Sequence, residues 1–386
     1  MGASPDAVIL ADMTTQTAPA AAVPLLTLSP GAAAPRIAVI TGSYGAGHNS
    51  AARELARVLT ALGCEVEIHD IVTLLPCRLG PVLRRAYYAQ LRRRPNSWGT
   101  TLKLLEPGRV AHRLVTRLLA FAAAPVVEAT RGCDLVVTTH PFGAQTLGHA
   151  RLSGQLAAPA ITYLTDTSVH SLWIHPGIDL NLAIHDVAAA EARHWGGATE
   201  VVRPLLPDSA PGVSGTENGE QPLVGEFVGP WALVTGGSLG MGELEETARD
   251  LVNDGQMTPV VLCGTDTRLR DRLSKIPGVV ALGWRDDVPA LMAASDCIVQ
   301  NAGGFTSLEA LASGSPVLTY RPLPGHGVAN SINLETAGLI PWARTSDDLA
   351  RLLTLAMTAP RHSRLPVDAP QVLDLITRLA PAIIAA

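Results

Sequence analysis

The chain has 386 residues, more than one hydrophobic core normally serves, so two domains are expected. Hydrophobic residues make up 47% of the sequence and charged residues 16%, a balance that excludes a disordered protein. The formal net charge of −5 provides no general basic surface, so nucleic acid is not expected as a partner. The five cysteines form no CxxC pair, which excludes a zinc-finger spacing and gives no indication of a disulfide framework.

Signals for export or membrane insertion are not evident. No apolar run reaches the roughly 18 to 20 residues that span a bilayer. The first residues, 1–14, lack the basic stretch that opens a secretory signal peptide. We therefore expect a cytoplasmic protein.

The N-terminal part of the chain is expected to be a tail followed by an α/β domain. Residues 1–35 are rich in Ala, Thr and Pro and are predicted to be disordered. Across 36–205, short β-branched runs alternate with helical patterns, which is typical of βα units wound into a parallel sheet. The strands expected there are 36–41, 65–69, 135–139, 161–165 and 180–184.

The same alternation returns after a segment without periodicity. Residues 206–229 are rich in Gly, Ser, Glu and Pro and are predicted to be a linker. A second α/β domain is expected over 230–360, and residues 361–386 are expected to form a C-terminal tail or helix. The strands expected in this second domain are 231–235, 259–263, 279–282, 297–300 and 317–320. Two such Rossmann-like domains facing across a cleft would bind ligands at the carboxyl ends of their strands.

A glycine-rich loop from Thr41 to His48 follows the first expected strand and leads into a helix. Glycines allow close approach to a ligand, and a helix N-terminus favours negative charge. The order G-x-x-G-x-G differs from the dinucleotide fingerprint G-x-G-x-x-G, but Asp70 stands where a ribose-binding acid would fall, so a dehydrogenase remains an alternative. An unperturbed imidazole titrates near neutral pH, so His48 is a candidate general base; the alternative is that it only caps or packs at the helix start.

Two more glycine-rich turns follow strands of the second domain. The turn from Thr235 to Gly242 has four glycines and is either an anion-binding nest or a structural turn. In 300–311, the amides of residues 303–305 and the Thr306 hydroxyl are expected to be free to hold a diphosphate. Glu309, one turn further on the same helix face, is placed to accept two ribose hydroxyls.

An ordered set of short motifs runs along residues 36–357. The set comprises Gly45-Ala46-Gly47-His48 with Ala51-Ala52, Thr165-Asp166 with His170 and Trp173, Gly283-Trp284, Ala302-Gly303-Gly304-Phe305-Thr306 with Glu309, and Pro322-Leu323-Pro324-Gly325 with Asn330. It resembles the family 28 glycosyltransferases, which include monogalactosyldiacylglycerol synthases, processive diacylglycerol glucosyltransferases and the N-acetylglucosaminyltransferase of peptidoglycan synthesis. Each motif alone is weakly specific, whereas their common order is strongly specific.

The resemblance implies a GT-B fold, a UDP-sugar donor and inversion at the anomeric carbon. It implies that His48 is the general base that takes the proton of the acceptor hydroxyl. Gly45, Gly47 and Trp173 would lie on the acceptor side. The donor-binding residues that it implies are Gly237, Ser238, Trp284, Val288, Asn301, Gly303, Gly304, Thr306, Glu309, His326 and Asn330. No D-x-D motif is present, so neither a metal nor another cofactor is expected, and amides and helix dipoles would stabilise the leaving group.

Asp166 and His170 follow the fourth expected strand and are further catalytic candidates. His170 is a second candidate acid or base, and Asp166 is placed to orient a histidine or to bind an acceptor hydroxyl. The alternative is that both only hold their loop. In the family this segment lies near the acceptor.

One departure from the family leaves the donor sugar open. The lipid-glycosylating relatives typically carry Pro-Gly-Gln-Glu where this chain has Pro324-Gly325-His326-Gly327. That turn faces the donor sugar in the family, and its carboxylate and amide are missing here. Neither galactose nor glucose can be assumed.

Residues 78–117 form the one basic region. Ten arginines and lysines accompany a single acid, Glu106, and they alternate with leucines and with Tyr87, Tyr88 and Trp98. This pattern is typical of a peripheral helix on an anionic membrane, here the inner face of the plasma membrane. A merely solvated face, or arginines that bind a phosphorylated acceptor, are the alternatives.

The sequence thus predicts an inverting, metal-independent glycosyltransferase that acts on a lipid or a small secondary-metabolite acceptor. Two other functions fit the same fold. One is a UDP-sugar 2-epimerase, which would need no acceptor site. The other is a non-catalytic sugar-nucleotide-binding protein. The sequence does not identify the sugar, the acceptor or the oligomeric state.

Overall fold

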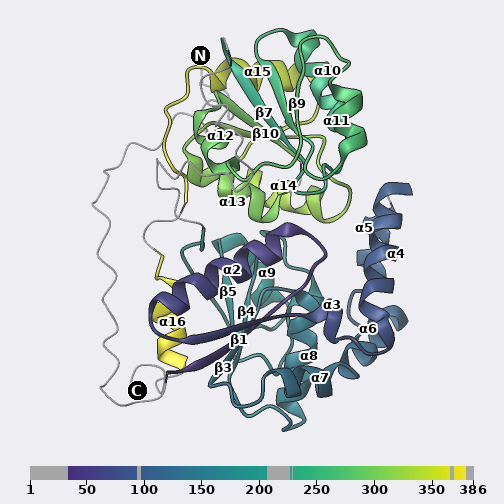
Figure 1. Cartoon of the computed structure of the whole chain (residues 1–386), viewed down its shortest axis with the longest axis vertical. Helices are drawn as coiled ribbons and strands as arrows, with labels where there is room; N and C mark the ends of the chain where they lie inside the picture. Colours follow the sequence, from purple (N-terminus) through teal and green to yellow (C-terminus); the bar gives the residue numbers. More distant parts are fainter. Residues whose placement is uncertain are drawn as a thin grey trace. The chain divides into compact units, whose positions relative to one another are not determined.

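A computed structural model describes residues 34–93, 97–206, 227, 229–301, 303–365 and 369–379. The predicted tail, 1–35, and the predicted linker, 206–229, fall almost wholly outside these ranges. The described chain divides into two compact units. We call 34–206 with 369–379 the first unit and 227–365 the second unit, and both are drawn in Figure 1.

A six-stranded parallel sheet forms the centre of the first unit, in the order β2-β1-β3-β4-β5-β6. Its strands are β1 (Arg36–Thr41), β2 (Glu65–Asp70), β3 (Leu135–Thr138), β4 (Ala160–Tyr163), β5 (Leu180–Ala183) and β6 (Thr199–Val201). The sheet is built outward in both directions from β1 and β3, which are neighbours. Their carboxyl ends therefore flank the point at which the winding of the chain reverses.

Helices surround this sheet and connect its strands (Figure 1). They are α2 (Ala46–Ala61), α3 (Ile71–Leu74), α4 (Leu79–Arg93), α5 (Ser97–Leu104), α6 (Val110–Ala120), α7 (Ala123–Ala129), α8 (Pro141–Leu152), α9 (Asp186–His194) and α16 (Val372–Leu379), with short 3₁₀ turns at Pro76–Arg78 and Ser171–Trp173. Helix α2 packs a row of small and branched residues against the sheet, because Ala51, Ala52, Leu55 and Leu59 recur on one helical face and are buried.

The C-terminal helix α16 belongs to the first unit. Its residues Val372, Leu373 and Ile376 are buried, and the Arg203 N–H donates to the Pro370 carbonyl at 2.9 Å. The sequence predicted one C-terminal segment, 361–386, after the second domain. The structure instead ends the second unit at Leu365 and returns the chain to the first unit, where α16 buries its strongly amphipathic face.

The second unit has its own six-stranded parallel sheet, in the order β12-β11-β10-β7-β8-β9. The strands are β7 (Trp231–Thr235), β8 (Thr258–Leu262), β9 (Val280–Leu282), β10 (Cys297–Gln300), β11 (Val317–Tyr320) and β12 (Trp342–Ala343). The helices are α10 (Leu244–Asp254), α11 (Thr267–Leu273), α12 (Val288–Ala294), α13 (Gly304–Ser313), α14 (His326–Thr336) and α15 (Ser346–Ala356). One hydrophobic cluster joins α10, α11 and α15 to one face of the sheet, and another joins α12, α13 and α14 to the opposite face.

The predicted α/β class with two Rossmann-like domains is confirmed. All ten predicted strands are present, and their ends differ from the prediction by at most two residues. The two strands that the sequence analysis missed, β6 and β12, have only three and two residues and lie at sheet edges. Such short strands have too few residues for a periodic pattern to be detected.

One segment of the described chain is long and apolar enough to cross a membrane by length and composition. It is Val110–Ala129, with a mean hydropathy of 1.4. The expectation that no segment reaches this length is therefore wrong. The segment combines α6 and α7, and the chain leaves the helical hydrogen-bond pattern between them, at Phe121 and Ala122. Because Arg113 and Arg117 lie on α6, composition alone does not make it a membrane span.

Candidate functional site

In the first unit, the residues that follow β1 and β3 meet where the winding of the sheet reverses. Thr41 ends β1 and leads through Gly42–Gly45 to α2, while Thr139 and His140 follow β3. Ligands of open parallel sheets bind at such points, just beyond the carboxyl ends of the strands. His48 lies here, in the first turn of α2.

His48 is held in one tautomer by its neighbours. Its Nδ1 atom lies 2.7 Å from the Thr139 carbonyl oxygen and 3.1 Å from the Thr165 hydroxyl oxygen. A carbonyl can only accept, so Nδ1 of the neutral ring carries the hydrogen and Nε2 keeps a lone pair. Within the described chain no hydrogen bond to Nε2 is present.

The surroundings of His48 also keep it neutral. Burial lowers the pKa of His48 to about 4, and the hydrogen bond to the Thr139 carbonyl raises the pKa by a smaller amount. A histidine with this pKa is unprotonated near pH 7 and can accept a proton. Because its pKa is lower, His48 is a weaker base than an ordinary histidine.

His140 is a residue that the sequence analysis missed. It precedes α8, and its Nδ1 accepts a hydrogen bond from the Phe142 N–H at 3.1 Å, which caps the helix. Its ring stacks on Tyr44, with centroids 5.1 Å apart, and meets the His48 ring edge-on at 4.7 Å. Burial lowers the pKa of His140 strongly, so it adds no positive charge beside His48. The dipeptide His140-Pro141, placed after a strand, was the available signal.

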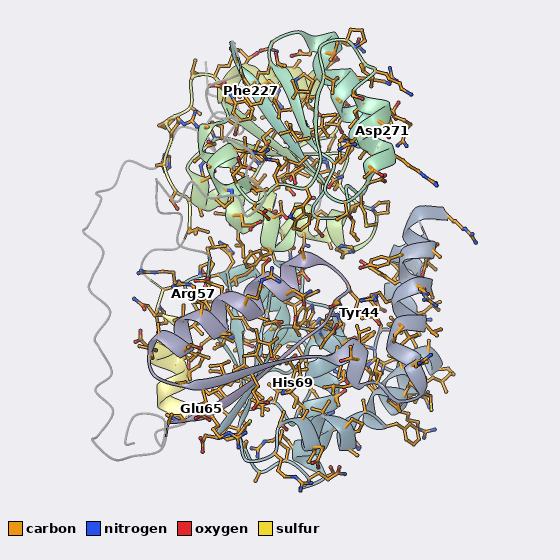
Figure 2. The ribbon with its side chains drawn as sticks, viewed as in Figure 1. Tyr44, Arg57, Glu65, His69, Phe227 and Asp271 are labelled. Atoms are coloured by element: carbon orange, nitrogen blue, oxygen red, sulfur yellow. The ribbon has the colours of Figure 1, made fainter. Side chains whose placement is uncertain are left out.

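Gly42 makes this packing possible. A Cβ atom on Gly42 would lie 2.5 Å from two ring carbons of His140. Tyr44, labelled in Figure 2, is fixed from α4, because the Tyr88 hydroxyl donates to the Tyr44 carbonyl at 3.1 Å and the Tyr87 ring packs edge-on against Tyr44. The glycine-rich loop is thus clamped between α4 and His140.

The predicted acceptor-side residues lie around the same point. The Trp173 ring is buried, with its centroid 5.8 Å from His48 and 6.3 Å from His170. Gly45 caps α2 in an extended conformation, and Gly47 lies in its first turn beside His48. The structure therefore brings His48, His170 and Trp173 together.

The contacts of Asp166 and Asp70 differ from the roles that the sequence suggested, which were to orient a histidine and to bind a ribose. Asp166 follows β4 and acts electrostatically on Tyr87, whereas the groups that orient His48 are Thr139 and Thr165. Asp70 accepts from the N–H groups of Ser43 and Val72, at 3.2 and 2.9 Å, and caps α3. Its carboxylate already binds the chain's own amides, which argues against the dehydrogenase alternative.

In the second unit, the winding reverses between β7 and β10, and three loops gather at the ends of β7, β10 and β11. The turn after β7 contains Gly237 and Gly242, which have φ values of 72° and 92°. Asn301, after β10, donates from Nδ2 to the Met241 carbonyl at 2.8 Å and accepts at its backbone oxygen from the Leu323 N–H after β11. Asn301 thereby connects all three loops.

Helices α13 and α14 begin next to these loops without capping side chains. The expectation that the Gly303 amide is free is wrong, because that N–H donates to Gln300 Oε1 at 2.8 Å. The first amides of α13 therefore belong to Gly304 and Phe305. His326 is the first residue of α14. Uncapped N-terminal amides of this kind favour anionic ligands.

Several predicted donor residues lie close to this helix start. Thr306 and Glu309 are half-buried on α13, and burial raises the pKa of Glu309 to about 7. Asn330, on α14, is fully buried, and a Cβ atom on Gly303 would lie 2.4 Å from the Asn330 Cβ. Ser238 lies in the turn after β7, and its carbonyl accepts from the Thr265 N–H.

Trp284 and Val288 lie elsewhere in the second unit, in and after the loop that follows β9. The strand β8 separates β9 from β7. The Trp284 side chain is 53% exposed, and its indole N–H donates to Asp286 at 2.9 Å. A largely buried ion pair between Arg285 and Asp287, at 2.6 Å, fixes the loop. These two residues are therefore separate from the loops at β7, β10 and β11.

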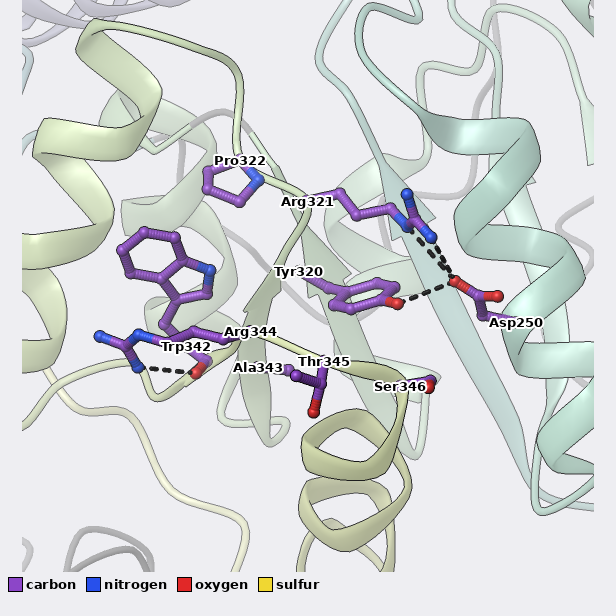
Figure 3. A pocket seen from close by; sticks show the side chains of 9 residues that line it. All are labelled: Asp250, Tyr320, Arg321, Pro322, Trp342, Ala343, Arg344, Thr345 and Ser346. Atoms are coloured by element: carbon purple, nitrogen blue, oxygen red, sulfur yellow. Dashed lines mark hydrogen bonds and ion pairs between the residues drawn. The ribbon is translucent and has the colours of Figure 1, made fainter.

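A pocket of about 340 Å³ that the sequence did not predict lies at the ends of β11 and β12 (Figure 3). Its two arginines bind carboxylates of the chain: Arg321 reaches Asp250 at 2.9 Å, and Arg344 pairs with Glu335 at 2.6 Å. Among the described residues, no group of three or more His, Cys, Asp or Glu side chains is arranged to hold a metal ion.

Comparisons with known proteins bear on the fold and on the class of enzyme. The family model for monogalactosyldiacylglycerol (MGDG) synthase matches residues 48–205. The processive diacylglycerol β-glucosyltransferase of Bacillus subtilis (strain 168) is 26% identical over 222 residues, which cover 53% of this chain and 56% of that protein. The protein of the same name from Bacillus thuringiensis (strain Al Hakam) is 23% identical, over 79% of this chain and 81% of its own length. In sequence the chain is thus similar to the family 28 glycosyltransferases.

The first of these family members is matched over little more than half of its length. Solved structures show the same fold. MurG of Acinetobacter baumannii superposes with a TM-score of 0.53 at 16% identity, covering 91% of this chain and all of that one. The protein LpCGTa, solved in complex with UDP, gives a TM-score of 0.57 at 16% identity, covering 90% of this chain and 99% of that one. The GT-B fold is therefore established for this chain.

Proposed function

We propose that this chain is an inverting glycosyltransferase that moves a sugar from a UDP-sugar to a hydroxyl of a lipid acceptor, with His48 as general base. The observation that carries the proposal is the tautomer of His48. Its neutral ring presents Nε2 as an acceptor, because the Thr139 carbonyl holds the hydrogen on Nδ1. A positioned base of this kind suits deprotonation of an attacking hydroxyl.

The proposed step is a single displacement. The acceptor hydroxyl gives its proton to His48 Nε2 while its oxygen forms a bond to the anomeric carbon. The bond from that carbon to the diphosphate oxygen breaks, and UDP leaves with the electron pair. Attack from the face opposite the leaving group inverts the anomeric carbon.

The loops of the second unit suit the leaving diphosphate. The amides of Gly304 and Phe305 open α13 without a capping side chain, and Gly237 lies in the left-handed region in the neighbouring turn. Fixed amides at a helix N-terminus stabilise developing negative charge without having to reorganise. We propose that these groups and Ser238 take the place of a metal ion, so that no cofactor is needed. Glu309 would accept the ribose hydroxyls, with Thr306 on the same helix face.

A lipid acceptor is supported by the surface of α4, α5 and α6. We define the α4–α6 face as the exposed apolar and basic side chains of this region. The apolar members are Val82, Leu104, Val110, Leu114 and Phe121, between 49% and 73% exposed. The exposed basic members are Arg78, Arg85, Arg93, Lys103, Arg109, Arg113 and Arg117. Apolar side chains beside cations are typical of a surface that lies on an anionic bilayer.

The relatives named above act on diacylglycerol by name, which favours the same class of acceptor here. A protein whose α4–α6 face rests on the membrane would meet such a lipid without extracting it far into water. We therefore place the protein in the cytoplasm, peripheral to the inner face of the plasma membrane.

The activity is tested with the purified protein, a panel of UDP-sugars and vesicles that contain diacylglycerol. We expect release of UDP together with a gain of one hexose mass on the lipid, in the anomeric configuration opposite to that of the donor. An epimerised sugar without a lipid product would identify the epimerase alternative instead. Binding of UDP-sugars without turnover in any combination would identify a non-catalytic binder.

Membrane association is tested by sedimentation with vesicles of phosphatidylglycerol and of phosphatidylcholine. The double variant Val110→Ser with Leu114→Ser should lose binding to the phosphatidylglycerol vesicles. Leu152→Ser is the matched control, because Leu152 is 65% exposed on α8, outside the α4–α6 face. Equal loss of binding in the control would contradict the assigned surface.

A further inference from the structure

We propose that Gln300 is a positioning residue for the diphosphate loops of the second unit. It is the last residue of β10 and is fully buried, so it does not itself meet the donor. The inference rests on the proposed function, because it concerns how the proposed donor site is built. The glycine-rich segment 300–311 begins at this residue, but the sequence analysis gave its side chain no role.

The two ends of the Gln300 amide hold two different elements. Its Oε1 atom accepts from the Gly303 N–H at 2.8 Å, and its Nε2 atom donates to the Thr319 hydroxyl at 2.6 Å. Gly303 is the residue before α13, with a φ of 68°. The bond to Gln300 therefore fixes the turn from which the amides of Gly304 and Phe305 project.

Gln300 is the centre of a buried polar row. In the register of the sheet, it pairs with Thr235 at the end of β7 and with Thr319 near the end of β11. Paired residues of neighbouring strands point to the same face, so all three side chains lie on the α13 side. The Thr235 hydroxyl accepts from the Gly237 N–H at 3.4 Å. Thr235 thus holds the turn after β7, Gln300 holds the turn before α13, and Thr319 on β11 holds the Gln300 side chain.

The row gives Gln300 a role that an apolar core residue could not fill. Buried polar groups are costly unless they are hydrogen-bonded, so the Gln300 amide, which has no exposed surface, depends on bonds such as those to Gly303 and Thr319. Losing them would free the Gly303 amide and loosen the turn before α13. The orientation of the first α13 amides toward a phosphate would then be lost, while the loop after β9 that carries Trp284 would remain as it is.

The test compares UDP with uridine, which lacks the diphosphate, by calorimetric titration of the full-length protein. Gln300→Met keeps the length of the side chain and removes the hydrogen bonds to Gly303 and Thr319. We expect UDP to bind about tenfold more weakly, the equivalent of roughly one hydrogen bond, while uridine, measured by competition, keeps its wild-type affinity. Equal weakening of UDP and uridine, or no weakening of UDP, would overturn the proposal.

Two further variants keep the test decisive if Gln300→Met folds poorly. Thr319→Val removes only the partner of Nε2 and should shift the ratio of UDP to uridine affinity in the same direction, by less. Val299→Ala is the control, because Val299 is buried in β10 on the opposite face and packs with α10 and α15. It should lower the melting temperature without changing the ratio. A wild-type protein that bound no UDP would refute the donor assignment itself, a result distinct from a variant that binds UDP normally.

Discussion

The Nδ1 atom of His48 lies 2.7 Å from the carbonyl oxygen of Thr139, so the neutral imidazole keeps its hydrogen on Nδ1 and its lone pair on Nε2. We predict that His48→Ala lowers kcat by about 10²- to 10⁴-fold, the usual contribution of a positioned base. UDP affinity should stay unchanged, because the residues assigned to the donor lie in the second unit. Steady-state kinetics and calorimetry measure the two quantities.

His194→Ala is the control for this variant, since His194 is exposed at the end of α9. It should retain full activity. Full activity of His48→Ala would instead mean that another group, with His170 the first candidate, takes the proton.

The low pKa of His48 predicts the shape of the pH profile. Protonation of Nε2 abolishes the base, so kcat at saturating donor should be constant from about pH 8 down to about pH 5 and fall only as the pH approaches the His48 pKa of about 4. An ordinary histidine would give an inflection near pH 6.5. Such an inflection in the wild-type enzyme, with its melting temperature constant over the range, would contradict the assigned environment.

Thr165 should act on the reaction through His48. Thr165→Val removes one of the two oxygens beside Nδ1, so we predict a fall in kcat of about five- to tenfold together with a shifted pH profile. Thr162→Val, in the preceding strand, is the matched control. The Thr162 hydroxyl is buried without a partner in the described chain, so its removal should be neutral or slightly stabilising.

Gly42 should tolerate no side chain. In Gly42→Ala the new methyl group would lie 2.5 Å from the His140 ring, and overpacking of this kind costs about 1–3 kcal/mol. Gly45→Ala should cost less, because no atom lies within 4 Å of its Cβ position and its φ of −167° suits any residue, so that only the poorer N-cap preference of alanine counts against it. Thermal melting of both variants decides the matter, and equal destabilisation would contradict it.

Glu309 should cost stability as the pH rises. Burial raises its pKa to about 7 in the folded protein, so the folded state binds more protons than the unfolded state between about pH 4.5 and about pH 7. Its contribution is therefore favourable at low pH and is lost as the pH rises through this window. Compared with the wild type, Glu309→Gln should raise the free energy of unfolding more at pH 8 than at pH 5, by as much as about 3 kcal/mol. The same variant should weaken donor binding.

Chemical denaturation at the two pH values measures the first effect, and the KM for the donor measures the second. An unchanged donor KM in Glu309→Gln would contradict the ribose role and leave the stability effect to burial alone.

The sequence predicted the sheets well because buried parallel strands are continuous apolar runs. The segments 36–41 and 297–300 were predicted to the residue, since each contains adjacent branched residues and ends at a turn-forming residue, Gly42 or Asn301. The return of α16 to the first unit could not be predicted. Its amphipathic pattern indicates a buried face, but a pattern does not say which of two cores buries it.

The candidate site was predictable where a local motif coincides with a strand end. His48 and the start of α13 are of this kind. Partners of these residues were missed because their roles depend on contacts that a motif does not show. His140 and Thr165 contact His48 across 92 and 117 residues of the chain, and Gln300 contacts Gly303 across 3 residues. Even the short contact from Gln300 to Gly303 was hidden, because the sequence does not show whether an amide side chain turns back onto its own backbone.

The return of α16 makes the second unit an insert within the first rather than an appendage to it. The described chain leaves the first unit after Leu206 and is back in it at residue 369. A chimera that borrows a donor-binding half from a relative therefore needs two junctions, one on each side of the exchanged cassette. A fusion with one junction would discard α16 and uncover the apolar surface that its buried residues protect.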